Sequence, residues 1–161
     1  MKEVRIIEGS LEAQNLKFTI VAARFNDAVV ERLIEGSVDA LRRHGADPAQ
    51  LELVRVPGAY DLPVVVRRIA ESGRADAIIA LGAVIRGETA HFDFVAGECA
   101  AGLSRVAADT GIPVAFGVLT TDTEEQAAER AGGKEGNRGA DAAQAAIRLA
   151  TLMRKLGARS S

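Results

Sequence analysis

Aromatic residues are scarce in this chain. They make up 4% of its 161 residues, with five Phe, one Tyr and no Trp. Charge of either sign is not in excess, since 20 Lys and Arg against 22 Asp and Glu give a formal net charge of −2. Nucleic-acid-binding domains usually combine a basic face with aromatic side chains that stack on bases. Both shortages argue against a nucleic-acid partner.

Cysteine occurs once, at Cys99, so an internal disulfide is excluded. Cys99 falls in an apolar helical pattern, and free cysteines are often buried. No apolar run approaches the roughly 18 residues that a membrane span needs. The start, Met1-Lys-Glu-Val-Arg5, lacks the apolar core of a signal peptide. We therefore expect a buried thiol, no membrane contact and a cytoplasmic location.

Motifs that bind metals or nucleotides are also missing. The sequence has no CxxC, HExxH, GxSxG or Walker A pattern, so we expect no metal and no cofactor. Only two histidines are present. His44 precedes Gly45 in the last turn of a predicted helix, where an imidazolium is favourable, and we interpret it as structural. His91 follows a predicted strand and has no such explanation.

Strand and helix patterns alternate along the chain. Apolar runs predict strands over 17–23, 51–56, 76–84 and 113–119, and helical spacing of apolar residues predicts helices between them. A final helix is expected up to about Lys155. Such alternation requires crossover connections, and therefore an α/β fold with a parallel sheet flanked by helices.

The chain length and the lack of a linker indicate one domain. We expect an N-terminal arm over 1–15 and a β/α body over 16–156. Val4–Ile7 is a short strand candidate that a polar stretch separates from the body, so we expect it to pair with a neighbouring subunit. Thr121-Asp-Thr-Glu124 predicts a capping box before a short helix. Residues 132–139 predict a turn-rich break.

All strand-to-helix corners of a parallel sheet meet at one edge, where open α/β folds bind ligands. The corners here bring together Phe25, Asn26, Tyr60, Asp61, Arg86, Glu88, Thr89 and His91. His91 is the candidate general acid or base, because an imidazole exchanges protons near neutral pH. Gly87 permits close backbone approach, and Thr89 adds a hydroxyl at a helix N-terminus, which suits phosphate.

Most of these residues have structural alternatives. Phe25 fits an ordinary core position, Asn26 fits a helix cap, and Asp61 fits a carboxylate that complements a helix dipole. Residues 86–89 fit a plain turn, in which the acid Glu88 is unfavourable beside an anion. Residues alone leave these alternatives open.

A basic cluster surrounds the turn-rich break. Arg130, Lys134 and Arg138 supply it. The cluster fits either a solvated turn or a phosphate clamp, since an Arg fork binds phosphate with two hydrogen bonds.

Several ordered motifs together resemble the 6,7-dimethyl-8-ribityllumazine synthase family, from about Ile7 to Met153. The matching segments are Ala23–Asn26, Val54–Tyr60, Gly82–Phe92, Phe116–Thr121, Glu125–Ala131 and Gly136–Gly139. The resemblance implies a flavodoxin-like, three-layer α/β/α sandwich with a central four-stranded sheet. It also implies a transferase without a cofactor, which condenses 5-amino-6-(D-ribitylamino)uracil with 3,4-dihydroxy-2-butanone 4-phosphate in the penultimate step of riboflavin biosynthesis.

The resemblance further implies a homo-oligomer with active sites at subunit interfaces. The unit would be a pentamer, and some members assemble twelve pentamers into a hollow shell. Riboflavin synthase, which such a shell could enclose, is then a candidate partner. His91 would carry protons. The pyrimidine and its ribityl chain would be held by Phe25, Asn26, Ala59, Tyr60, Asp61, Ala83, Val84, Ile85, Phe116 and Lys134. The phosphate would be held by Gly87, Glu88, Thr89 and Arg130. Phe116 and Arg130 would come from the neighbouring subunit.

The chain departs from the family pattern in two places. Asp61 stands where Glu is common, and its shorter side chain predicts a longer or water-mediated contact to the ribityl chain. Glu135 lies beside Lys134 and is expected to tether it.

Three other functions fit parts of the pattern. A riboflavin synthase of the archaeal type shares this architecture but dismutates two lumazines, so product identity separates it. A flavin or lumazine carrier would bind ligand without turnover. A receiver-type signalling module would need clustered acids at the end of the first strand, where Ala22-Ala-Arg24 stands.

Overall fold

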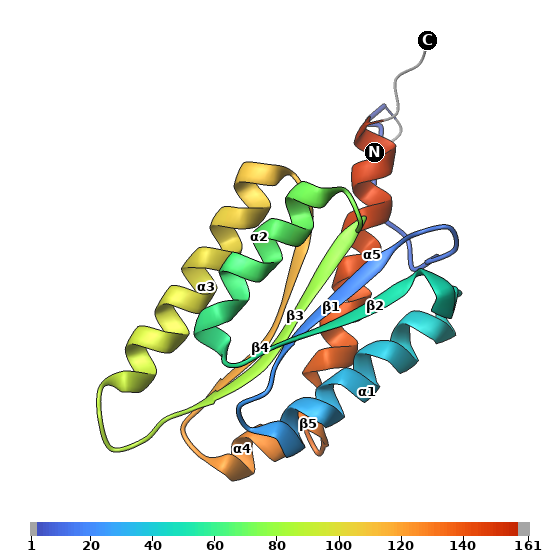
Figure 1. The fold of residues 1–161 in the computed structure, drawn as a ribbon. Helices are drawn as coiled ribbons and strands as arrows, with labels where there is room; N and C mark the ends of the chain where they lie inside the picture. Colours follow the sequence, from blue (N-terminus) through green and yellow to red (C-terminus); the bar gives the residue numbers. More distant parts are fainter. Residues whose placement is uncertain (1–2, 158–161) are drawn as a thin grey trace.

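The computed structural model describes residues 3–157 as a four-stranded parallel sheet between two layers of helices (Figure 1). The strand order is β2-β1-β3-β4. The strands are β1 (Phe18–Ala23), β2 (Leu51–Val56), β3 (Ala77–Ile85) and β4 (Val114–Thr121). The helices are α1 (Asp27–Arg43), α2 (Leu62–Ser72), α3 (His91–Thr110), α4 (Glu124–Glu129) and α5 (Arg138–Gly157). The predicted α/β sandwich with its four parallel strands is confirmed.

Short elements complete the chain. Two 3-10 turns precede β2 and α2, at η1 (Pro48–Gln50) and η2 (Ala59–Asp61). The predicted break at 132–139 contains a small antiparallel hairpin, formed by β5 (Ala131–Gly133) and β6 (Gly136–Asn137).

The core consists of two apolar clusters, one on each face of the sheet. Helices α1 and α5 cover one face, and α2 and α3 cover the other (Figure 1). Strand β1 explains why its own segment of the sequence is a nearly continuous apolar run. Its Ile20 belongs to the α1/α5 cluster and its Val21 to the α2/α3 cluster, and all six of its residues are buried. A central parallel strand covered on both faces needs this composition.

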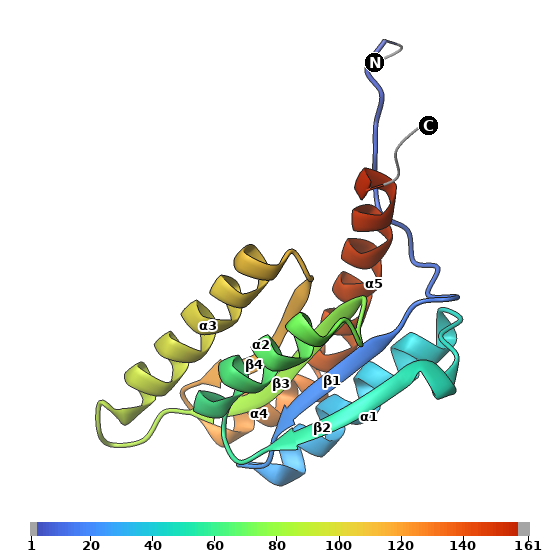
Figure 2. The same cartoon turned by 45° about the horizontal axis from the view of Figure 1, so that its top comes forward.

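The strand at Val4–Ile7, expected to pair with a neighbouring subunit, stays a prediction, because the structure holds a single chain. These residues form no strand, and Val4 and Ile6 are more than half exposed. The N-terminal trace extends past the C-terminal end of α5, away from the sheet (Figure 2). A strand requires a partner for its backbone N–H and C=O groups, and none of the described strands pairs with this segment. By contrast Ala13 and Leu16, in or next to the predicted arm, are buried in the core.

The predicted capping box at Thr121–Glu124 is also wrong. Strand β4 extends through Thr121, whose carbonyl accepts a 2.8 Å hydrogen bond from the backbone N–H of Arg86. The cap of α4 is formed two residues later, where Thr123 Oγ1 accepts from the backbone N–H of Gln126 at 3.1 Å. Continued pairing with β3 therefore removes Thr121 from the capping role.

Candidate functional site

A cavity of about 710 Å³ opens at the carboxyl end of the sheet. Three of the four predicted corners line it, namely those after β1, β2 and β3. The lining residues are Phe25, Asn26, Pro57, Gly58, Ala59, Tyr60, Asp61, Ala83, Val84, Ile85, Gly87, Thr89, His91, Phe92, Phe94 and Val95. The parallel sheet thus places most of the predicted site residues around one space, as the topology requires.

Asn26 connects two walls of this cavity. Its backbone has φ 65° and its side chain does not cap α1, so the interpretation as a side-chain cap is wrong. Instead Nδ2 donates a 2.7 Å hydrogen bond to the carbonyl oxygen of Ala83. The left-handed backbone, which Asn tolerates better than most residues, turns the amide toward β3.

Two aromatic rings are presented to solvent at the mouth. Phe25 is 73% exposed and Tyr60 is 64% exposed, although both belong to residue types that folded chains usually bury. The alternative that Phe25 is an ordinary core residue is therefore wrong. Exposed rings beside a cavity offer flat apolar faces on which a planar ligand can stack.

Asp61 has a structural function besides facing the cavity. Its Oδ2 accepts a 3.0 Å hydrogen bond from the backbone N–H of Gly58, which closes the η2 turn before α2. One carboxylate oxygen is thus engaged in holding the turn that presents Ala59 and Tyr60.

The end of β3 exposes one backbone edge to the cavity. Pairing with β1 stops at Leu81, whereas pairing with β4 continues through Ile85. The backbone N–H of Arg86 points to β4, so the alternation along a strand turns the N–H and C=O groups of Ala83 and Ile85 toward the other edge. The N–H and C=O groups of Val84 face β4, and Val84 is also one of the residues that line the cavity.

His91 is the first residue of α3 and lies at the cavity beside a short exposed loop of residues 87–90. Its backbone N–H donates a 3.3 Å hydrogen bond to Thr89 Oγ1. Gly87 and Thr89 line the cavity, but Glu88 does not. The dipole at the N-terminus of a 20-residue helix favours an anion in this position.

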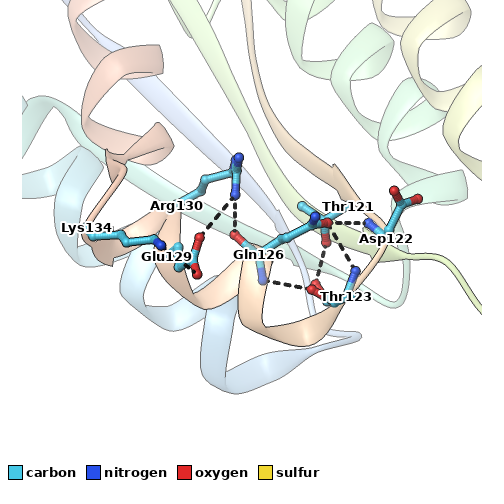
Figure 3. A network of polar contacts seen from close by, with 7 residues as sticks. All are labelled: Thr121, Asp122, Thr123, Gln126, Glu129, Arg130 and Lys134. Carbon is cyan, nitrogen blue, oxygen red and sulfur yellow. Dashed lines mark hydrogen bonds and ion pairs between the residues drawn. The ribbon is translucent and has the colours of Figure 1, made fainter.

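Phe116, Arg130 and Lys134 do not line the cavity of their own chain. Phe116 on β4 is 46% exposed. One guanidinium nitrogen of Arg130 donates to the carbonyl of Gln126 at 3.0 Å and lies 3.7 Å from Glu129, as Figure 3 shows. The geometry of one chain therefore separates these three residues from the other predicted site residues.

The expected tether of Lys134 by Glu135 is wrong. Lys134 Nζ lies 3.5 Å from a carboxylate oxygen of Glu129 (Figure 3). The β5–β6 hairpin folds this lysine back over the end of α4, while Glu135 contributes its backbone N–H to the Glu129 carbonyl at 2.9 Å. Arg138, the third residue of the basic cluster, pairs with Asp141 at 3.3 Å.

Sequence reasoning missed five lining residues. These are Pro57, Gly58, Phe92, Phe94 and Val95. A signal was present, because Phe94 and Val95 follow His91 at spacings of three and four, which places them on the same face of a helix. Phe94 is 70% exposed, which is unusual for an ordinary helix residue of its size.

Among residues 3–157, no group of three or more His, Cys, Asp or Glu side chains is arranged to hold a metal ion. Within the same residues, every helix is too short or too polar to cross a membrane.

Comparison with known proteins identifies the family of the chain. The family model for 6,7-dimethyl-8-ribityllumazine synthase matches residues 15–154. A protein of that name from Nitratidesulfovibrio vulgaris (strain DSM 19637 / Miyazaki F) is 53% identical over 156 residues, which cover 97% of this chain and 100% of the relative. Another from Halorhodospira halophila is 54% identical and covers 96% and 100%. The chain belongs to the 6,7-dimethyl-8-ribityllumazine synthase family.

Proposed function

We propose that this chain condenses 5-amino-6-(D-ribitylamino)uracil with 3,4-dihydroxy-2-butanone 4-phosphate, and that it does so in the cavity beside His91. The products are 6,7-dimethyl-8-ribityllumazine, phosphate and water. One observation supports the location above all others. The cavity combines an imidazole, exposed aromatic rings and an open backbone edge, next to a helix N-terminus. The family membership supports the reaction.

The pyrimidine half of the site lies between the first two corners and β3. Phe25 offers a ring face for the planar pyrimidine. The backbone edge at Ala83 and Ile85 pairs with no strand and offers N–H and C=O groups to the alternating donors and acceptors of a uracil, with one acceptor position of the Ala83 carbonyl already taken by Asn26. The ribityl chain then extends toward Tyr60 and Asp61, whose second carboxylate oxygen accepts from a hydroxyl.

The phosphate half lies at loop 87–90. Gly87 and Thr89 present backbone N–H groups at the start of α3, and Glu88 contributes its backbone rather than its side chain. Arg130 of a neighbouring subunit, with Lys134 close by, supplies the positive charge that helps phosphate leave.

The chemistry asks little of the protein beyond placement. The amine and the ketone already react with each other to form an imine, and holding them in register removes much of the barrier. Loss of phosphate and ring closure follow, each of which requires proton transfers. His91 performs these as general acid and base.

Members of this family are oligomers that act on small molecules, and we propose a pentamer with shared active sites. Phe116 and Arg130 lie outside the cavity of their own chain, and the exposed Val4 and Ile6 pair with none of the strands within residues 3–157. A neighbouring copy explains all four residues together. Light scattering of the purified protein separates a pentamer from a shell of twelve pentamers, which is the form able to enclose riboflavin synthase. A cytoplasmic location fits the single unpaired cysteine.

Mixed subunits test the sharing of sites. We expect His91→Ala and Arg130→Ala to be slow as separate oligomers. Unfolding and refolding them together should raise the rate above that of either variant, because some sites then receive both native residues. A mixture no faster than the mean of its components would place both residues in one subunit's site.

The two histidines form a matched pair for testing the role of His91. His91→Ala should lower kcat without abolishing turnover, because the substrates are still held together. His44→Ala should leave kcat unchanged, since His44 ends α1 and lies outside the cavity. Equal rates for His91→Ala and the wild type would remove His91 from the mechanism.

A further inference from the structure

Arg86 contacts three separate parts of the chain. Its backbone N–H donates to the carbonyl of Thr121 at the end of β4, at 2.8 Å. Its Nε lies 3.0 Å from Asp122 Oδ1, in the corner between β4 and α4. A second guanidinium nitrogen lies 3.5 Å from Asp93, in the first turn of α3, and the guanidinium carbon lies 4.3 Å from the centre of the Phe92 ring.

These contacts enclose loop 87–90. The loop begins immediately after Arg86 and ends at His91, and Arg86 reaches past its far end to Phe92 and Asp93. Residues 87–90 are exposed. The loop's own hydrogen bonds lie at its C-terminal end, where the backbone N–H of His91 donates to Thr89 Oγ1 at 3.3 Å and that of Asp93 donates to the carbonyl of Ala90 at 3.1 Å. The contacts that join the loop to the β4–α4 corner come from the residue that precedes it.

We propose that Arg86 is a positioning residue for the reaction. It fixes both ends of loop 87–90 to the β4–α4 corner, and thereby keeps the phosphate-binding backbone of Gly87 and Thr89 in register with the imidazole of His91. This inference rests on the proposed function, since it concerns the same cavity. It assigns to Arg86 a task that neither phosphate binding nor proton transfer describes.

Direct binding of phosphate by Arg86 is a weaker interpretation. Arg86 does not line the cavity, and two carboxylates and a ring surround its guanidinium. Figure 3 shows that the Asp122 carboxylate points away from the capping contacts of α4, so it is available to Arg86. A planar guanidinium can serve a carboxylate and a ring face at once, whereas the ammonium of Lys is a point charge.

Each contact is individually weak, because Arg86, Asp93 and Asp122 are all about half exposed or more. Their sum over one short loop is larger. An exposed ion-pair network together with one cation–π contact corresponds to about a tenfold change in the equilibrium constant between the ordered and the disordered loop. The predicted loss in kcat/KM is at most of that size.

Steady-state kinetics of Arg86→Met give the first test. We expect a higher KM for the butanone phosphate and a lower kcat, with the KM for the pyrimidine unchanged. Arg67→Met is the matched control, because Arg67 pairs with Asp109 at 2.8 Å between α2 and α3 with similar exposure, away from the cavity. Wild-type kinetics for Arg86→Met, or an equal loss for Arg67→Met, would overturn the assignment.

Asp122→Asn distinguishes anchoring from charge by the sign of its effect. If Arg86 acted through its charge on the phosphate, loss of the neighbouring carboxylate would lower the KM for the butanone phosphate. If Arg86 anchors the loop, the same change raises that KM. If Arg86 anchors the loop, the single variant Arg86→Met and the double variant Arg86→Met/Asp122→Asn also have nearly equal rates, because both have lost the contact between Arg86 and Asp122. A lowered KM contradicts our proposal.

Hydrogen exchange provides a readout that does not depend on turnover. We expect faster amide exchange in residues 87–93 of Arg86→Met and Asp122→Asn, with the rest of the chain unchanged. Unaltered exchange in this segment would overturn the proposal. If residues 87–93 exchange faster in the two variants than in the wild type, but the wild type forms no lumazine, the proposed function fails while the role of Arg86 in anchoring the loop stands. Failure of the proposed function is therefore distinguishable from failure of this inference.

Discussion

The side-chain amide of Asn26 and the carbonyl of Ala83 are joined by a 2.7 Å hydrogen bond across the cavity. The bond ties the corner after β1 to the unpaired edge of β3, at the place where the pyrimidine is proposed to bind. A side chain from the corner after β1 therefore holds part of the β3 backbone edge that pairs with no strand.

Replacing Asn26 should loosen this wall. Asn26→Gly tolerates the φ of 65° but removes the bond, which is worth about 1 kcal/mol. We expect the KM for the pyrimidine to rise by about fivefold, while the KM for the butanone phosphate stays constant. Initial rates with one substrate varied at a time measure both values. A rise confined to the phosphate substrate would contradict the assignment of the two halves.

Thr19 offers a stability test that leaves the site intact. Among the described residues its buried Oγ1 has no hydrogen-bond partner, and the residue is fully inaccessible near the start of β1. Thr19→Val keeps the shape and removes the orphaned hydroxyl, so the free energy of unfolding should rise by about 1 kcal/mol. Thr19→Ser keeps the hydroxyl and loses a methyl group, so it should destabilise. Urea denaturation at fixed protein concentration compares the three proteins, and a less stable Val variant would refute the argument.

Gly139 marks the closest approach of α5 to α1. A Cβ at this position would lie 2.0 Å from the carbonyl oxygen of Leu33, and Ser37 Oγ donates to the Gly139 carbonyl at 2.6 Å. Gly139→Ala must push the helices apart, which typically costs about 1–3 kcal/mol. Gly157→Ala is the control, because nothing lies within 4 Å of a Cβ there. Thermal unfolding should show a large loss for the first variant only.

Cys99 should be unreactive in the folded protein. Burial raises the pKa of its thiol from 9.0 to about 11, since the charged thiolate is poorly solvated in the core. Alkylation by iodoacetamide at pH 8 should therefore be slow in buffer and fast in denaturant. The folded state binds this proton more tightly, so the stabilisation is present below pH 9 and declines as the pH rises toward about 11. Rapid alkylation of native protein would contradict this burial.

Much of the site follows from the sequence through the parallel sheet. Once Phe25, Asp61 and His91 are recognised as residues that directly follow strands, the topology alone brings them to one edge. The corner after β4 does not follow this logic within one chain. That corner lies at the same edge, but β4 is the last strand of the sheet and its residues 116–121 do not line the cavity of their own chain.

Other features depend on contacts that no local pattern encodes. Thr121 and Thr123 both begin a capping-box pattern, and only the length of the β3–β4 pairing decides between them. Lys134 pairs with Glu129 rather than with its neighbour Glu135 because a hairpin reverses the chain. The apolar residues of Val4–Ile7 predict a strand correctly in composition, yet a strand needs a partner edge that one chain does not provide.

The most direct test of the account is product analysis of the purified wild-type protein with both substrates. We predict that lumazine and inorganic phosphate appear in equal amounts, at a rate well above that of the uncatalysed mixture. Phosphate release without lumazine, or neither product from protein that binds the pyrimidine, would contradict the proposal that this cavity carries out the condensation.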